Sequence, residues 1–88
     1  MEKLTSKEAK QIGNNLGIDW ERVDLKEFTM GLNVELEHGT RYPETNVTNN
    51  DKLLTGKIAW AHLIEFPDYY TRLEKMEEEA DAYWKFRD

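Results

Sequence analysis

Apolar side chains recur three and four positions apart along much of this chain, which is the spacing of one face of a helix. The first segment shows this spacing at Ala9, Ile12 and Leu16. Thr5 and Glu8 stand just ahead of it with the spacing of a capping box, in which the Thr5 side chain accepts from the Glu8 amide and Glu8 reaches back. A helix is therefore predicted here, and Gly17 is a natural stop for it.

The hydrophobic pattern near residues 28–37 fits both the period of a strand and the period of a helix. Apolar and polar residues alternate near residues 28–37, as in a strand, yet apolar residues also recur there at helical spacing. Asp24 and Glu27 form a second capping box, no second convincing strand is present to pair with, and Gly39 would stop a helix. These signals favour a helix that ends at about His38. A short strand in the same segment, which would make the fold α+β, is the alternative.

The second half of the chain predicts a loop and two further helices. Residues 40–51 are rich in asparagine and threonine, which favour turns. Tyr42 and Val47 are expected to pin this loop to the body. A third helix is predicted to run to about Phe66, where Pro67 ends or kinks it.

The last helix is predicted from about residue 68 to residue 86, with Asp68 in its first turn. Its inward line is expected to consist of five residues, Tyr69, Leu73, Met76, Ala80 and Tyr83. The sequence therefore predicts one all-α domain over residues 1–88, with about four helices. The last two helices are expected to form a hairpin-like pair joined at Pro67.

Length and charge limit the classes of function. The 88 residues suffice for one small domain, and the absence of cysteine excludes disulfides and thiolate metal sites. The formal net charge is −6 and the basic residues are scattered among acidic ones, which argues against nucleic acid as a partner. No apolar run approaches the ~20 residues of a membrane span. The N-terminus lacks the apolar stretch of a signal peptide, so we expect a cytoplasmic protein.

The chain has two histidines, and each lies three residues from a glutamate, Glu35 before His38 and Glu65 after His62. On a helix this spacing puts both side chains of a pair on one face. Neutral imidazole and carboxylate groups suit Zn²⁺, Mn²⁺ or Fe²⁺. One hypothesis is therefore a mononuclear metal site that uses these four residues.

The other hypothesis is a buried polar network without a metal. Each histidine would then lie at a contact between helices and hydrogen-bond a neighbouring carboxylate or tyrosine. Glu37 and Asp68 are additional acidic candidates for either arrangement. Tyr69 and Tyr70 begin the last helix, where we expect them to pack in the core or at its edge. Such a network would favour one helix arrangement over its competitors.

An enzyme is harder to reconcile with these residues. The hydroxyl side chains stand in caps and loops and not beside a base, and four short helices offer little concavity to exclude water. The residues favour a small non-catalytic interaction or accessory module that binds a protein partner or a second copy of itself. Trp60 and Trp84 would mark the partner surface if both are exposed.

Two strings carry a resemblance to a known family. Val-Glu-x-Glu-His spans residues 34–38, and Ile-Ala-x-x-His-Leu-x-Glu-x-Pro-Asp-Tyr-Tyr spans residues 58–70. They resemble a family of small uncharacterised proteins, a domain of unknown function found in bacteria, archaea and phages. The resemblance covers about residues 25–80. It implies a compact, mostly helical intracellular domain, sometimes a segment of larger phage-associated proteins, and it transfers no mechanism.

Overall fold

A computed structural model describes residues 3–85, and all regular structure in that range is helical. The elements in order are α1 (Ser6–Leu16), α2 (Leu25–Arg41), the 3₁₀ turn η1 (Pro43–Thr45), α3 (Lys52–Glu65) and α4 (Tyr69–Lys85). The all-α prediction is confirmed, and so is the junction of the last two helices around Pro67. Residues 28–37 belong to α2, so the alternative of a strand there is wrong.

Capping residues set the start of α1 as the sequence predicts. The Thr5 hydroxyl oxygen accepts from the Glu8 N–H at 3.2 Å, and the Glu8 carboxylate accepts from the Thr5 N–H at 3.0 Å. The hydrogen bond from the Thr5 backbone lowers the pKa of Glu8, since it favours the ionised carboxylate. The helix ends at Gly17, whose φ of +84° is a left-handed conformation that glycine adopts without strain.

Helix α2 continues past its predicted end at His38 to Arg41. Gly39 therefore lies inside the helix, and the loop that follows packs directly on it. A Cβ at this position would lie 2.9 Å from the Asn46 Oδ1 atom, closer than real Cβ contacts allow. The glycine therefore provides room for the loop and does not end the helix.

The loop after α2 is held by a different residue from those predicted. Val47 and Tyr42 are exposed, so the expectation that they pin the loop is wrong. Thr48 is buried instead, and the Thr55 hydroxyl on α3 lies 3.3 Å from its Oγ1. Thr55 also donates to the Asp51 carbonyl at 2.7 Å. The two polar side chains of Thr48 and Thr55 are thus buried together and hold the loop against this end of the core.

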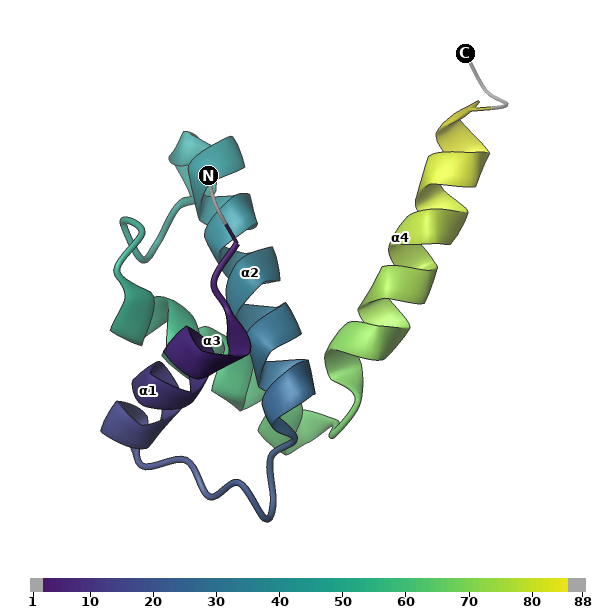
Figure 1. Cartoon of the computed structure of the whole chain (residues 1–88). Helices are drawn as coiled ribbons and strands as arrows, with labels where there is room; N and C mark the ends of the chain where they lie inside the picture. Colours follow the sequence, from purple (N-terminus) through teal and green to yellow (C-terminus); the bar gives the residue numbers. More distant parts are fainter. Residues whose placement is uncertain (1–2, 86–88) are drawn as a thin grey trace.

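Helices α1, α2 and α3 form the body of the molecule (Figure 1). Their shared core is centred on Phe28 and Leu32 of α2, which are both fully buried. Gly56 lets α3 approach α1, because a Cβ there would lie 2.9 Å from the Leu16 side chain. Three helices therefore supply most of the buried apolar surface.

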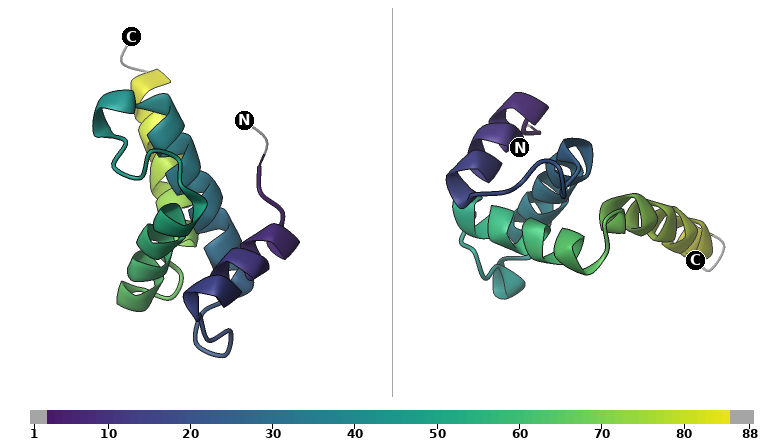
Figure 2. Two further views of the ribbon diagram at one scale, coloured as in Figure 1. Left: turned by 90° about the vertical axis from the view of Figure 1, so that its left-hand side faces the viewer. Right: turned by 90° about the horizontal axis from the view of Figure 1, so that it is seen from below.

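Helix α4 departs from this body as an arm (Figures 1 and 2). Tyr70 is buried and Leu73 is half-buried, but the residues beyond them are exposed. Met76 has 58% of its surface exposed and Tyr83 50%. The prediction of an inward apolar line along the whole helix is therefore wrong beyond Leu73. The reason is that α2 and α4 diverge, so that within residues 3–85 the far half of α4 is separated from α2 by an open groove and is not packed against it.

The first turn of α4 is capped by Glu27 from α2. Its Oε1 atom accepts from the N–H groups of Tyr70 and Thr71, both at 3.2 Å, and its Oε2 atom accepts from the Thr71 hydroxyl. A carboxylate here satisfies donors that a helix start leaves free and interacts favourably with the helix dipole. Asp24 caps its own helix as predicted, but the second half of that capping box is wrong, because Glu27 turns to α4.

We predict that Glu27→Ala lowers the free energy of unfolding by about 2 kcal/mol, because two amide N–H groups at a buried helix start lose their acceptor. Urea denaturation followed by circular dichroism would measure this loss. Glu37→Ala on the same helix is the matched control. Among residues 3–85 its exposed carboxylate pairs only with Arg41, so the change should cost less than about 0.5 kcal/mol. Equal losses in the two variants would contradict the capping role.

Candidate functional site

Three side chains from three helices meet at the foot of the arm. The Tyr70 hydroxyl donates to Glu35 Oε2 at 2.8 Å, and His62 Nδ1 lies 3.1 Å from the Tyr70 hydroxyl oxygen. His62 Nδ1 and Glu35 Oε2 are 3.6 Å apart. Glu35 comes from α2, His62 from α3 and Tyr70 from α4. We call these three residues the Tyr70 network.

The local sequence of α2 makes room for this network. Gly31 and Glu35 are four residues apart and so lie on one face of the helix. The Tyr70 ring packs directly against Gly31, where a Cβ would lie 2.4 Å from a ring carbon. Only glycine leaves space for the ring at this position. The hydroxyl then reaches Glu35 one turn further along.

The two adjacent tyrosines have different environments. Tyr70 is 1% exposed and its hydroxyl is inside the network. Tyr69 is half-buried and stacks on the His62 ring, with centroids 4.4 Å apart and planes 18° apart. His62 is therefore held between a ring face and a hydroxyl, which fixes its orientation.

Burial raises the pKa of Tyr70 far above its ordinary value, and the hydrogen bond to Glu35 and the charge of that carboxylate raise it further. The phenol consequently keeps its proton and gives it to Glu35 as a hydrogen bond. Its oxygen is then free to accept from His62, which favours the tautomer with hydrogen on Nδ1. A phenol held in this way does not exchange protons near neutral pH, so the network acts as a clamp between helices.

The structure joins only two of the four candidate metal ligands. Glu35 and His62 are in contact, whereas His38 and Glu65 are exposed, and no hydrogen bond or ion pair within residues 3–85 links either of them to that pair. His38 instead lies 5.6 Å from the Tyr42 ring centroid. In the same range, no group of three or more His, Cys, Asp or Glu side chains is placed to hold a metal ion.

The remaining candidates lie outside the Tyr70 network. Glu37 pairs with Arg41 at 3.5 Å on the exposed side of α2. Asp68 pairs with Arg72 at 2.9 Å. Trp60 is half-buried on α3 and packs against the core. Of the two tyrosines, Tyr70 belongs to the network and Tyr69 stacks on the His62 ring.

Two residues that hold the site together were missed by sequence reasoning. Glu27 was interpreted as a cap of its own helix, and nothing in a single sequence indicates that its carboxylate crosses to α4. Gly31 gave a weak signal, because a glycine in a helix interior costs about 1 kcal/mol relative to alanine and usually has a packing reason. Here that reason is the Tyr70 ring.

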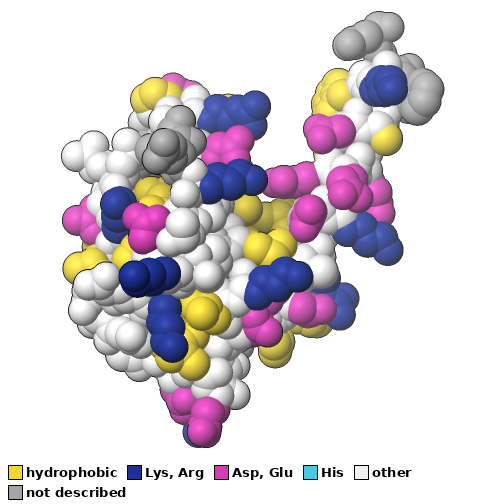
Figure 3. Space-filling model, in the orientation of Figure 1, with side chains coloured by type: hydrophobic (Ala, Val, Ile, Leu, Met, Phe, Trp, Pro, Cys, Tyr) yellow, Lys and Arg dark blue, Asp and Glu magenta, His cyan; other side chains and the backbone are white. Residues whose placement is uncertain are grey.

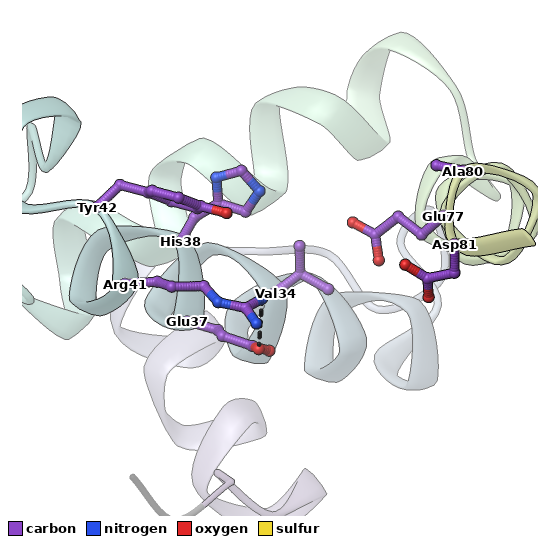
Figure 4. Close-up of a pocket in the computed structure, with 8 residues that line it drawn as sticks. All are labelled: Val34, Glu37, His38, Arg41, Tyr42, Glu77, Ala80 and Asp81. Carbon is purple, nitrogen blue, oxygen red and sulfur yellow. Dashed lines mark hydrogen bonds and ion pairs between the residues drawn. The ribbon is translucent and has the colours of Figure 1, made fainter. Parts of the chain in front are cut away.

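A groove opens beside the network, between α2 and α4 (Figure 4). Its volume is about 350 Å³. The α2 wall consists of Val34, Glu37, His38 and Arg41 with Tyr42 at its end, and the α4 wall of Glu77, Ala80 and Asp81. In Figure 4 the Glu77 and Asp81 carboxylates extend from α4 toward α2. The groove is thus a polar cleft with a few apolar side chains.

The family model for a protein of unknown function, DUF5661, matches residues 9–79. The chain belongs to this family. The match includes α2, α3, the whole Tyr70 network and Glu27. No curated protein and no solved structure matches the chain. Among residues 3–85, no helix is both long enough and apolar enough to cross a membrane.

We predict that Tyr70→Phe lowers the free energy of unfolding by about 1–3 kcal/mol, because Glu35 and His62 both lose a partner. Tyr42→Phe is the control, since the Tyr42 side chain is exposed. It should change stability by less than about 0.5 kcal/mol. Thermal unfolding at neutral pH measures both variants. A loss near zero for Tyr70→Phe would mean that the network does not hold α4.

The same variant tests the pKa shift of Tyr70. Because the folded pKa lies above the unfolded value of 10.0, the folded chain keeps this proton at a pH where the unfolded chain has lost it. This contribution is therefore complete below about pH 10 and decreases as the pH rises further. The stability of Tyr70→Phe should fall less steeply above pH 10 than that of the wild type. Parallel slopes would contradict the shift.

We predict that Zn²⁺, Mn²⁺ or EDTA leaves the unfolding temperature unchanged within about 1 °C. Glu35 and His62 supply two ligands at most, and the Tyr70 hydroxyl already engages both. An ion present at 100 times its dissociation constant would add about 2.7 kcal/mol, which is more than 10 °C for a domain of roughly this size. A rise of that magnitude, lost in His62→Ala, would establish a metal site.

Proposed function

We propose that this protein is a small, non-catalytic interaction module that presents α4 to a protein partner. The observation that carries the proposal is the exposure of large apolar side chains along the arm. Met76, Tyr83 and Trp84 are 58%, 50% and 64% exposed. In a chain with a formal net charge of −6, three large apolar side chains exposed on one helix are typical of a contact surface.

The chemistry of the arm supports a protein as the partner. Tyrosine and tryptophan are enriched among the residues that dominate binding energy at protein interfaces. Tyr83 and Trp84 are adjacent, with ring centroids 5.1 Å apart and planes 88° apart. Acidic side chains precede them on the same helix, which opposes contact with nucleic acid phosphates. Figure 3 shows these acidic side chains along the arm.

The Tyr70 network has a positioning role in this proposal. It fixes the first turn of α4 by a ring packed on Gly31, a hydroxyl bonded to Glu35 and a cap from Glu27. A helix held at its base projects at one angle, which lowers the ordering cost that binding would otherwise require. In this proposal the network therefore has a structural role. We also expect the protein to act in the cytoplasm.

We predict that Trp84→Ala abolishes self-association or partner binding in the native host while the fold survives. Tagged protein would be crosslinked in cells, purified and analysed by mass spectrometry, and its own mass in solution would be measured by light scattering. Ile64→Ala is the control, because Ile64 is 69% exposed but lies on α3. It should keep the partner. Equal recovery of all species with both variants would contradict an interaction surface on the arm.

A further inference from the structure

We propose that the groove between α2 and α4 binds a basic amphipathic helix of a partner protein. This inference rests on the proposed interaction function and specifies where on the molecule the partner binds and what chemistry it carries. The helices α2 and α4 diverge from each other (Figure 1), and side chains from both line the groove between them (Figure 4). Two helices that diverge in this way can accept a third helix between them.

The charges of the groove are unequal on its two walls. On α2, Arg41 is already paired with Glu37 at 3.5 Å. On α4, Glu77 and Asp81 point into the groove, and no hydrogen bond or ion pair joins either to another residue between positions 3 and 85. Two acceptors therefore face the open space without a cation. An occupant with lysine or arginine would supply the missing partners.

The groove also offers apolar contacts at helical spacing. Val34 is half-buried on the α2 wall, and Ala80 lies across from it on α4. Trp84, one turn beyond Ala80, is on the same face and 64% exposed. An occupant that alternates basic residues with an apolar stripe fits both kinds of contact. This combination is the chemistry of a basic amphipathic helix.

A second copy of this chain is a poor occupant of the groove. The exposed arm is the helix of a second copy that projects from its body, and it carries five acidic residues, Glu74, Glu77, Glu78, Glu79 and Asp81. Like charges would then meet Glu77 and Asp81 of the first copy, which disfavours the contact. The acidic walls therefore select a partner of opposite charge and reject self-association at this site.

The test uses two synthetic helical peptides of roughly 18 residues, long enough to span the groove at 1.5 Å per residue. Both carry leucine at helical spacing, one with lysine and the other with glutamate at the remaining positions. Calorimetry would measure binding to the full chain. Amide chemical-shift changes would locate the bound peptide. We expect only the basic peptide to bind, with shift changes concentrated at Val34, His38, Ala80 and Asp81.

The chain offers a matched pair of variants for this test. E77K/D81K reverses the two carboxylates inside the groove. E78K/E79K changes the net charge by the same amount, but these two residues do not line the groove. We expect the first variant to weaken basic-peptide binding by about tenfold or more and the second by less than about threefold, because long-range attraction alone is screened by salt. Circular dichroism would verify that both variants fold.

Four results would overturn the inference. They are no binding of the basic peptide, equal binding of the acidic peptide, equal weakening by the two variants, or a dimer in solution that E77K/D81K disrupts. Each is distinguishable from failure of the proposed function. Suppose that Trp84→Ala loses its cellular partner but E77K/D81K and E78K/E79K bind the basic peptide equally well. The interaction function then stands, and only the groove as the binding site and its preference for basic partners fail.

Discussion

The burial of the Tyr70 side chain between α2 and α3 is the constraint on which the rest of the structure depends. Its ring needs a glycine at position 31, and its hydroxyl needs an acceptor one turn further along the same helix. Both are present, and His62 completes the set from α3. A buried hydroxyl without a partner would cost about 1–3 kcal/mol. Among the described residues, no buried side-chain polar atom is without one.

This constraint explains why α4 is both fixed and exposed. Its first turn is held by four residues of α2 and α3, Glu27, Gly31, Glu35 and His62, whereas the side chains of its far half are exposed in the part of the chain that the structure describes. A small three-helix body cannot cover a helix of this length that leaves at a divergent angle. The exposed apolar residues on the arm therefore follow from the same contacts that anchor its base. The first turn of α4 thus contributes to the stability of the fold, and its far half exposes apolar side chains to solvent.

Much of the fold could be predicted because its signals are local. The capping residues Thr5 and Asp24 and the break at Pro67 mark helix boundaries through neighbours within a few residues. The candidate site was harder, because its geometry is set by contacts across the chain. The sequence predicts one cluster of Glu35, His38, His62 and Glu65, but only Glu35 and His62 meet, whereas His38 and Glu65 are exposed. Spacing places side chains on a face and does not say which face meets another helix.

The cap that Glu27 provides has a kinetic consequence. It ties the opening of the first turn of α4 to the loosening of α2 in the body, because both helices share the same carboxylate. The outer turns have no such tie and can unwind and rewind without disturbing the core. We therefore expect backbone amides in the first turn of α4 to exchange hydrogen more slowly than those in its exposed outer turns. A ligand that binds the outer turns of α4 would slow their unwinding and leave the opening rate of the first turn unchanged.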